Sequence, residues 1–273
     1  MARRSLIALA GVEARRLVLH PLVLAGAALS VLAVAAGAQR DGQAQSFLLM
    51  GVAVLPLALG TFVAANLAAL RSVRAGADEL LDTLPQDVRT RTGAQLLALL
   101  AAVPMAVALL AVAYLIFGAG DGLIISQHGA RRVPALAELA QGPLLVLALG
   151  AFGVFLGRVL PVAQLAALLV VVIVFAEVPL AAWAPETPLR WAVPLVNDII
   201  AVPDTWVPCE PGSSYLCGEV ARFDTAAMTW HLLALAVIAA TAAAAALARG
   251  RAARAGLAAA AVAVVATTTL VAA

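Results

Sequence analysis

The sequence predicts an all-α polytopic membrane protein, and three observations lead to that fold class. Of the 273 residues, 64% are hydrophobic and only 12% are charged, with a mean hydropathy of +1.04. A soluble domain is about half apolar and a quarter charged. The apolar residues form long continuous runs, which are typical of membrane helices rather than of the alternating strands of a transmembrane barrel. The polar residues collect between these runs.

The long apolar runs define the predicted spans. A helix needs about 20 mostly apolar residues to cross a bilayer, and by this measure six spans are predicted, at 19–37, 47–70, 94–118, 143–160, 161–182 and 226–248. The last run, 257–273, is shorter and rich in alanine, so it is either a seventh span or a helix at the membrane surface. The predicted division is therefore a surface helix at 1–18, a six-span domain at 19–248, and a basic loop with a possible seventh span at 249–273.

The distribution of arginine orients these spans, because the chain contains no lysine. With the N-terminus in the cytoplasm, 12 of the 17 basic residues fall on the inner side. Cytoplasmic loops carry an excess of basic residues, and tryptophan favours the membrane interface. All four tryptophans lie on the predicted outer side or at its boundary. The sequence therefore predicts a multi-pass protein of the cell membrane with a cytoplasmic N-terminus.

The N-terminal segment 1–18 has the pattern of an amphipathic helix. On a helical wheel one arc is apolar and consists of Leu6, Ile7, Ala10, Ala14, Leu17 and Val18. The other arc is charged and consists of Arg4, Glu13, Arg15 and Arg16. Such a helix suits the surface of a membrane. The alternative is a basic tail that serves only to orient the protein.

Two polar loops stand out. The cytoplasmic loop 71–93 contains "AGADELLDTLPQDVRTR", in which Gly76 precedes a short helical pattern and Pro85 ends it. Its apolar face consists of Leu80, Leu81 and Leu84. Burial of each leucine is worth about 1.5–3 kcal/mol, so this face should be covered by the inner ends of the spans, by lipid headgroups, or by a groove on a soluble partner.

The outer loop 183–225 is rich in proline. It contains "LRWAVPLVNDIIAVP", which is amphiphilic and too short to span, so a re-entrant or interfacial segment is predicted before span six. The only cysteines, Cys209 and Cys217, enclose a Pro-Gly turn in "CEPGSSYLC". On the oxidising side of the membrane a disulfide between them is expected.

The layout resembles the permease subunit of ABC transporters of the second exporter type, the ABC-two membrane fold. The resemblance rests on "GVEARRLVLHPLVLAG" at 11–26, on "GADELLDTLPQDVRTRTGAQLLALL" at 76–100, and on the tight turn "GRVLP" at 157–161. It covers most of 1–248. The C-terminal run 257–273 departs from the six-span core of that family.

The resemblance implies that residues 76–85 are a coupling helix seated in the cleft of a separate ATPase subunit. The residues that would make this contact are Asp78, Glu79, Leu80, Leu81, Asp82, Leu84 and Pro85. It also implies a second permease, either another copy or a paralogue, so that spans two and five of the two permeases enclose an export path. The alternative is a membrane-embedded regulator or assembly factor that binds a soluble cytoplasmic partner without transport.

No catalytic motif is present, so the chain is not expected to be an enzyme. A Walker A loop requires a lysine, and the sequence has none. It also has no H-E-x-x-H, no G-x-S-x-G and no Cys/His cluster. No cofactor or metal is therefore expected in this chain, and ATP and Mg²⁺ would be bound by the partner ATPase.

A few polar and small residues within the spans are candidates for a substrate path, a gate or helix packing. Thr61 and Asn66 of span two and Glu177 of span five are candidates for the path, because polar groups inside membranes are often functional. Asn66 and His231 could instead hydrogen-bond between helices. Gly153 and Gly157 form a G-x-x-x-G in span four, which predicts a close-packing face. Pro56 and Pro104 are expected to bend spans two and three.

Overall fold

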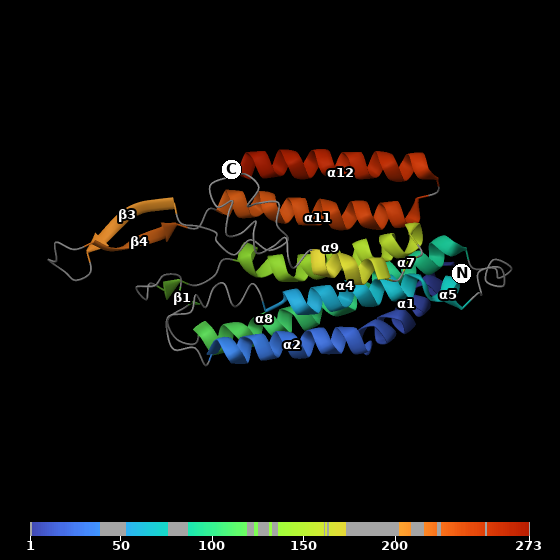
Figure 1. The fold of residues 1–273 in the computed structure, drawn as a ribbon, viewed down its shortest axis with the longest axis horizontal. Helices are drawn as coiled ribbons and strands as arrows, with labels where there is room; N and C mark the ends of the chain where they lie inside the picture. Colours follow the sequence, from blue (N-terminus) through green and yellow to red (C-terminus); the bar gives the residue numbers. More distant parts are fainter. Residues whose placement is uncertain are drawn as a thin grey trace.

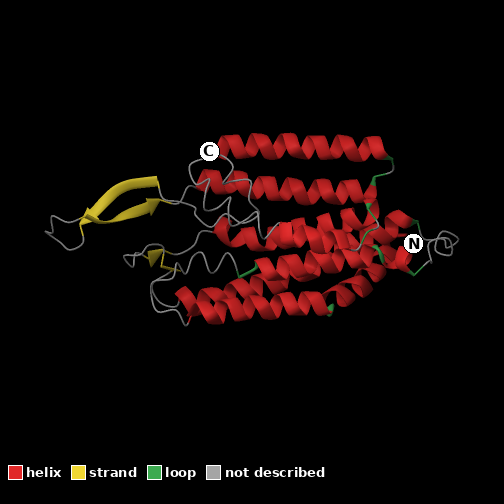
Figure 2. Cartoon of the chain, viewed as in Figure 1, coloured by secondary structure: helices red, strands yellow, loops and turns green. Residues whose placement is uncertain are grey.

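In the computed structural model the described part of the chain is a bundle of helices that run side by side, with two short hairpins at one end (Figures 1 and 2). The structure describes residues 2–38, 53–75, 87–118, 123–124, 131–132, 136–160, 162, 164–172, 202–208, 216–222, 225–248 and 250–272.

Three helices in this described part are long and apolar enough to cross a membrane, namely Val88–Ile116, Leu139–Val159 and Met228–Leu247. A fourth candidate is the pair Arg4–Val18 and Pro21–Ala36, which is bent by 51°. Two further apolar helices, Leu55–Ala69 and Ala252–Thr267, are shorter. The chain is therefore a largely helical protein with the character of a membrane protein, and the full count of six or seven spans stays a prediction.

The first half of the chain contains helices α1 (Ala2–Val18), α2 (Pro21–Ala38), α4 (Leu55–Ala69) and α5 (Arg71–Arg74), then α7 (Val88–Ala98), the 3₁₀ turn η1 (Leu99–Ala102) and α8 (Val103–Gly118). α7, η1 and α8 together make one long path where span three is predicted. Proline lacks the N–H of a helical hydrogen bond, and Pro104 is the second residue of α8, which follows the 3₁₀ turn. Pro56 instead lies in the first turn of α4, where proline is tolerated.

The second half contains α9 (Leu136–Val159), α11 (Thr225–Leu247) and α12 (Arg251–Ala272), and residues 164–172 are also helical. α9 begins before the predicted start of span four and continues through Pro143. α12 begins before the predicted 257 and turns back alongside α11 (Figure 1). The turn between them contains Gly250, whose φ of +96° is readily adopted only by glycine.

The core surrounds α4, which packs against α2 on one side and α9 on another. Glycines permit both approaches. A Cβ at Gly26 would lie 2.5 Å from the carbonyl oxygen of Pro56, and one at Gly60 would collide with that of Leu22. On the α9 side, a Cβ at Gly153 would collide with the carbonyl oxygen of Phe62, and one at Gly157 would lie 2.8 Å from the Cβ of Ala69. The structure thus confirms that the G-x-x-x-G is a close-packing face.

The hairpins are the main departure from the predicted fold. β1 (Leu123–Ile124) pairs with β2 (Arg131–Arg132), and β3 (Val202–Pro208) pairs with β4 (Leu216–Arg222), both antiparallel. The β3–β4 hairpin extends beyond the end of the bundle that is opposite the N-terminus (Figure 1). A helical segment was expected in this loop, and most of that segment, 189–201, lies outside the described residues. Prolines at 203 and 208 disfavour a helix but are tolerated in the edge strands of a two-stranded hairpin.

Candidate functional site

The predicted coupling segment 76–85, with all seven of its candidate residues, lies outside the described residues. Both of its flanks are described. The chain enters from α5, which follows α4 directly, and leaves through Asp87, whose carbonyl oxygen accepts hydrogen bonds from the backbone N–H groups of Thr90 and Arg91 in the first turn of α7. The candidate site is therefore the polar region that holds these two flanks.

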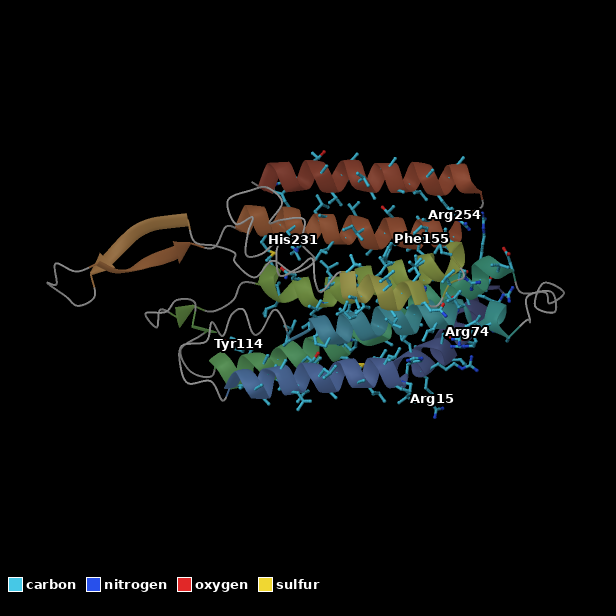
Figure 3. The ribbon with its side chains drawn as sticks, in the orientation of Figure 1. Arg15, Arg74, Tyr114, Phe155, His231 and Arg254 are labelled. Carbon is cyan, nitrogen blue, oxygen red and sulfur yellow. The ribbon has the colours of Figure 1, made fainter. Side chains whose placement is uncertain are left out.

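Basic residues gather at this end of the bundle. Arg15 of α1, Arg74 of α5 and Arg254 of α12 all lie there, whereas His231 and Tyr114 lie toward the opposite end (Figure 3). Three helices that are distant in the sequence thus place arginines in one layer. This is the arrangement that the arginine distribution predicts for the cytoplasmic side.

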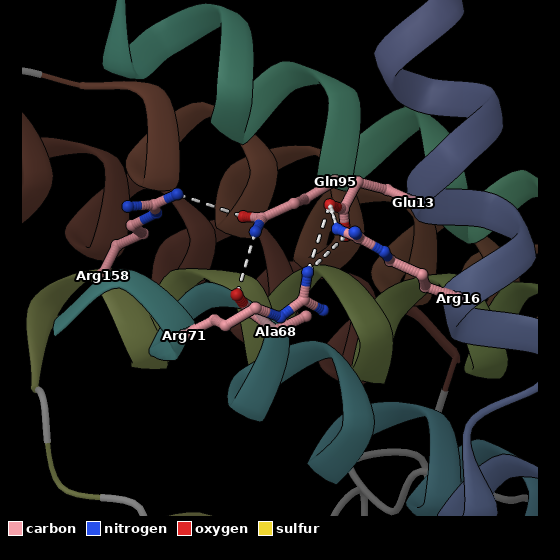
Figure 4. Close-up of polar contacts among 6 residues, drawn as sticks. All are labelled: Glu13, Arg16, Ala68, Arg71, Gln95 and Arg158. Carbon is pink, nitrogen blue, oxygen red and sulfur yellow. Dashed lines mark hydrogen bonds and ion pairs between the residues drawn. The ribbon is translucent and has the colours of Figure 1, made fainter. Parts of the chain in front are cut away.

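The entry flank is held by an ion pair between α5 and α1. Nη1 of Arg71 lies 3.3 Å from Oε1 of Glu13, and Nη1 of Arg16 lies 3.1 Å from the same oxygen (Figure 4). The side chain of Glu13 is only 11% exposed, whereas those of Arg16 and Arg71 are 58% and 48% exposed. Glu13 therefore joins the N-terminal helix to α5, which precedes the predicted coupling segment 76–85.

This position of Glu13 corrects the predicted helical wheel. The wheel assigns Glu13 to the polar arc with Arg4, Arg15 and Arg16, yet the structure turns its side chain inward. The predicted apolar arc also divides, because Leu17 is buried whereas Ile7 is 59% exposed. The cause is the contact of α1 with α7 and η1, which a wheel for an isolated helix does not include.

The exit flank is held by a second set of hydrogen bonds. Gln95 of α7 donates from Nε2 to the carbonyl oxygen of Ala68 in α4 over 3.0 Å, and its Oε1 accepts from Nη2 of Arg158 in α9 over 3.2 Å (Figure 4). One amide therefore links α4, α7 and α9, about two helical turns after the start of α7. α5 on the entry side therefore contacts α1, and α7 on the exit side contacts α4 and α9.

The candidate path residues of span two are buried within the single chain. Thr61 and Asn66 both have 0% exposure. The hydroxyl of Thr61 donates to the carbonyl oxygen of Leu57 over 2.8 Å, within α4. Nδ2 of Asn66 donates to the carbonyl oxygen of Gly153 over 3.3 Å, across the contact with α9. In this conformation Thr61 and Asn66 serve helix packing, and a role in the path stays a prediction.

The other predicted site residues are separate from this region. Glu177 and Cys209 lie outside the described residues, and the side chain of Cys217 in β4 is not described. The hairpin pairs Pro208 with Leu216, so the neighbours of the two cysteines in the sequence face each other. The disulfide itself stays a prediction.

The sequence alone did not predict that a polar cluster would form from Glu13, Arg71, Gln95 and Arg158. A signal for them was present, because Gln95 and Arg158 are polar residues at the predicted inner ends of spans three and four. Depth in the membrane alone places them in one layer, but their pairing depends on how the helices pack. Among the described residues, no group of three or more His, Cys, Asp or Glu side chains could hold a metal ion.

Comparison of the chain with protein-family models, with characterised proteins and with solved structures finds no match.

Proposed function

We propose that this chain is the transmembrane permease subunit of an ATP-driven exporter of the ABC-two type. In this proposal residues 76–85 bind a separate ATPase subunit, and a second permease copy or paralogue completes the export path. The N-terminus, α5 and the start of α7 lie in the cytoplasm. The β3–β4 hairpin then lies outside, where Cys209 and Cys217 form a disulfide and Glu177 lies near the outer end of the path.

The observation that carries the proposal is the anchoring of both flanks of 76–85. One flank is tied to α1 by the pair of Glu13 with Arg71, and the other is tied to α4 and α9 through Gln95. A segment that passes motion to the spans needs contacts with several helices on both of its sides, and a mere connecting loop does not. The bent pair α1 and α2, with its 51° angle, further supports a surface helix that leads into span one.

The proposal extends to a seventh span. α12 lies against α11 and parallels its course (Figure 1), and it carries no acidic residue in its first turn. A helix of this composition beside a candidate span is better placed within the bilayer than on its surface. The C-terminus is then on the outer side.

Substitution of Leu80 and Leu81 by Asp tests the coupling assignment. Charged side chains do not fit an apolar groove, so the variant should insert into the membrane normally and lose more than 90% of the co-purifying ATPase, as an order-of-magnitude expectation. Val88→Asp is the matched control, because Val88 is 42% exposed at the same end of the bundle but outside 76–85. It should retain the ATPase.

Two outcomes would overturn this assignment. Undiminished ATPase co-purification with the double variant would show that 76–85 is not the contact. Co-purification of a soluble partner without ATPase activity, lost in the same variant, would favour the regulator or assembly factor. Transport measured in vesicles that contain the ATPase separates a permease from a protein that only recruits the enzyme.

A further inference from the structure

The N-terminal helix α1 has two faces, and only one of them is covered by the rest of the bundle. The inner face lies on α7 and η1. The outer face consists of the exposed residues Arg4, Ile7, Ala8, Gly11, Val12, Arg15 and Arg16, and the exposed Leu19 directly follows the helix. Of the predicted apolar arc only Ile7 is exposed on this outer face, and the chemistry of the face is mixed.

A stripe of four residues runs along the middle of the outer face. Arg4, Ala8, Gly11 and Arg15 follow at intervals of three or four residues, so they line one side of the helix. With a rise of 1.5 Å per residue, the two arginines are about 16 Å apart along the axis. A Cβ at Gly11 would meet nothing within 4 Å, so the surface between the arginines is low and open.

The charge of this stripe is not neutralised within the described part of the chain. α1 has no acidic residue in its first turn. Its one carboxylate, that of Glu13, is turned inward and pairs with Arg16 and Arg71. No ion pair to Arg4 or Arg15 occurs among the described residues. Two free guanidinium groups therefore face outward, and guanidinium is well suited to bind phosphate.

Apolar side chains border the stripe. Ile7 is 59% exposed, Val12 is 49% exposed and Leu19 is 57% exposed. The following helix α2 also exposes Leu29 and Leu32, as expected for a helix that contacts acyl chains. Arginines bordered by apolar residues on a helix beside a membrane span are typical of helices in the headgroup layer.

We propose that the outer face of α1 is a binding site for anionic membrane lipids. Arg4 and Arg15 bind the phosphate groups, and Ile7, Val12 and Leu19 contact the upper parts of the acyl chains. The preference is for lipids with net negative charge, because a zwitterionic headgroup cancels much of the attraction. The inference requires only that α1 lies at a membrane surface, and it is independent of the proposed ATPase coupling.

Native mass spectrometry of the full chain in mild detergent tests this site. The protein is titrated with phosphatidylglycerol and, separately, with phosphatidylcholine. Each arginine near an anionic surface is worth about a fivefold change in affinity. Arg4→Gln combined with Arg15→Gln should therefore weaken phosphatidylglycerol binding by about 25-fold and leave phosphatidylcholine binding unchanged. Arg4→Lys with Arg15→Lys should retain most of the affinity.

The matched control is Arg74→Gln with Arg89→Gln. Both residues are exposed at the same end of the bundle and are outside α1, so the control removes the same charge without touching the stripe. It should change phosphatidylglycerol binding by less than about twofold. Gly11→Glu is a second probe that does not remove an arginine. It fits the open space at Gly11 and should also weaken phosphatidylglycerol binding through repulsion.

Several results would overturn the proposal. One is unchanged phosphatidylglycerol binding in both the double glutamine variant and Gly11→Glu. Another is a loss of binding in the control variant as large as that in the double glutamine variant, which would indicate unspecific charge attraction. Binding of glycerol phosphate as tight as that of the lipid would show that acyl chains take no part. Loss of the co-purifying ATPase in the double glutamine variant with lipid binding intact would show that the face binds protein instead.

Discussion

Two regions of the molecule hold helices together by different means. One is the contact between α4 and α9. The other is the polar layer on either side of 76–86, formed by Glu13, Arg71, Gln95 and Arg158. Between α4 and α9 the backbones approach so closely that a Cβ at Gly153 would collide with a carbonyl oxygen, and Asn66 adds one hydrogen bond. In the polar layer the helices are held by long side chains, namely Glu13, Arg71 and Arg158, which are partly exposed. The first contact is rigid because it leaves no space. The second can change its partners at small cost.

The difference has a physical basis in the surrounding medium. In a bilayer, helices associate mainly through close packing of small residues. At the membrane surface, water competes for every charged group, and an exposed ion pair is worth little. We therefore expect substitutions in the α4–α9 contact to act on stability, and substitutions in the polar layer to act on coupling. Three measurements test this contrast.

The largest effect on the stability of the folded protein is expected from Gly153→Ala. The new methyl group has no room against Phe62 O, so the variant should lose about 1–3 kcal/mol of stability by overpacking, seen as a lower unfolding temperature in detergent by tryptophan fluorescence. Gly256→Ala in α12 is the control, because a Cβ there meets nothing within 4 Å. It should be neutral or slightly stabilising, since alanine favours helices. Equal effects at both positions would contradict the close packing.

A smaller effect is expected from Asn66→Leu. The change removes the hydrogen bond to the carbonyl oxygen of Gly153, and such bonds between membrane helices are worth about 0.6–1.7 kcal/mol. Stability should fall by this amount, with transport reduced only in proportion to folded protein. A variant of normal stability with altered transport would instead support the predicted role of Asn66 in the substrate path.

The smallest effect on stability is expected in the polar layer. Glu13→Gln should cost only about 0.2–1 kcal/mol, because its partners are half exposed. If the proposed ATPase partner binds at 76–85, the same change should reduce its stimulation by cargo. A double-mutant cycle with Arg71→Gln isolates the pair. If Glu13→Gln destabilises the protein as much as Gly153→Ala, the contrast between the two regions is wrong.

The sequence was informative wherever the signal is local. Apolar runs are local, so each predicted span contains described helical residues, and the spacing of Gly153 and Gly157 was sufficient to predict a close contact. The predicted ends of the helices were less accurate than the predicted spans themselves. Span four is predicted to begin at 143 from its apolar run, but α9 begins at Leu136.

Features that depend on distant residues could not be predicted. The inward turn of Glu13 depends on Arg71, which comes 58 residues later, and on the surface of α7. The β3–β4 hairpin joins two segments whose composition is compatible with several structures, and its register is set by pairing across the loop. The leucine face at 76–85 is a clear local signal, but what covers it depends on another chain or on the fold around it.

The unbroken path through α7, η1 and α8 has a mechanical consequence. α7 starts directly after 76–86, and α8 ends at the far side of the bundle, so the path could transmit a tilt from one end to the other. With 11 residues in α7 and 16 in α8, the arms measure about 16 Å and 24 Å. Leu99 of η1 packs against Gly150 of α9, at the point where the two arms meet. If the path tilted as a rigid body about this point, the far end of α8 would move about 1.5 times as far as the near end of α7, and in the opposite direction.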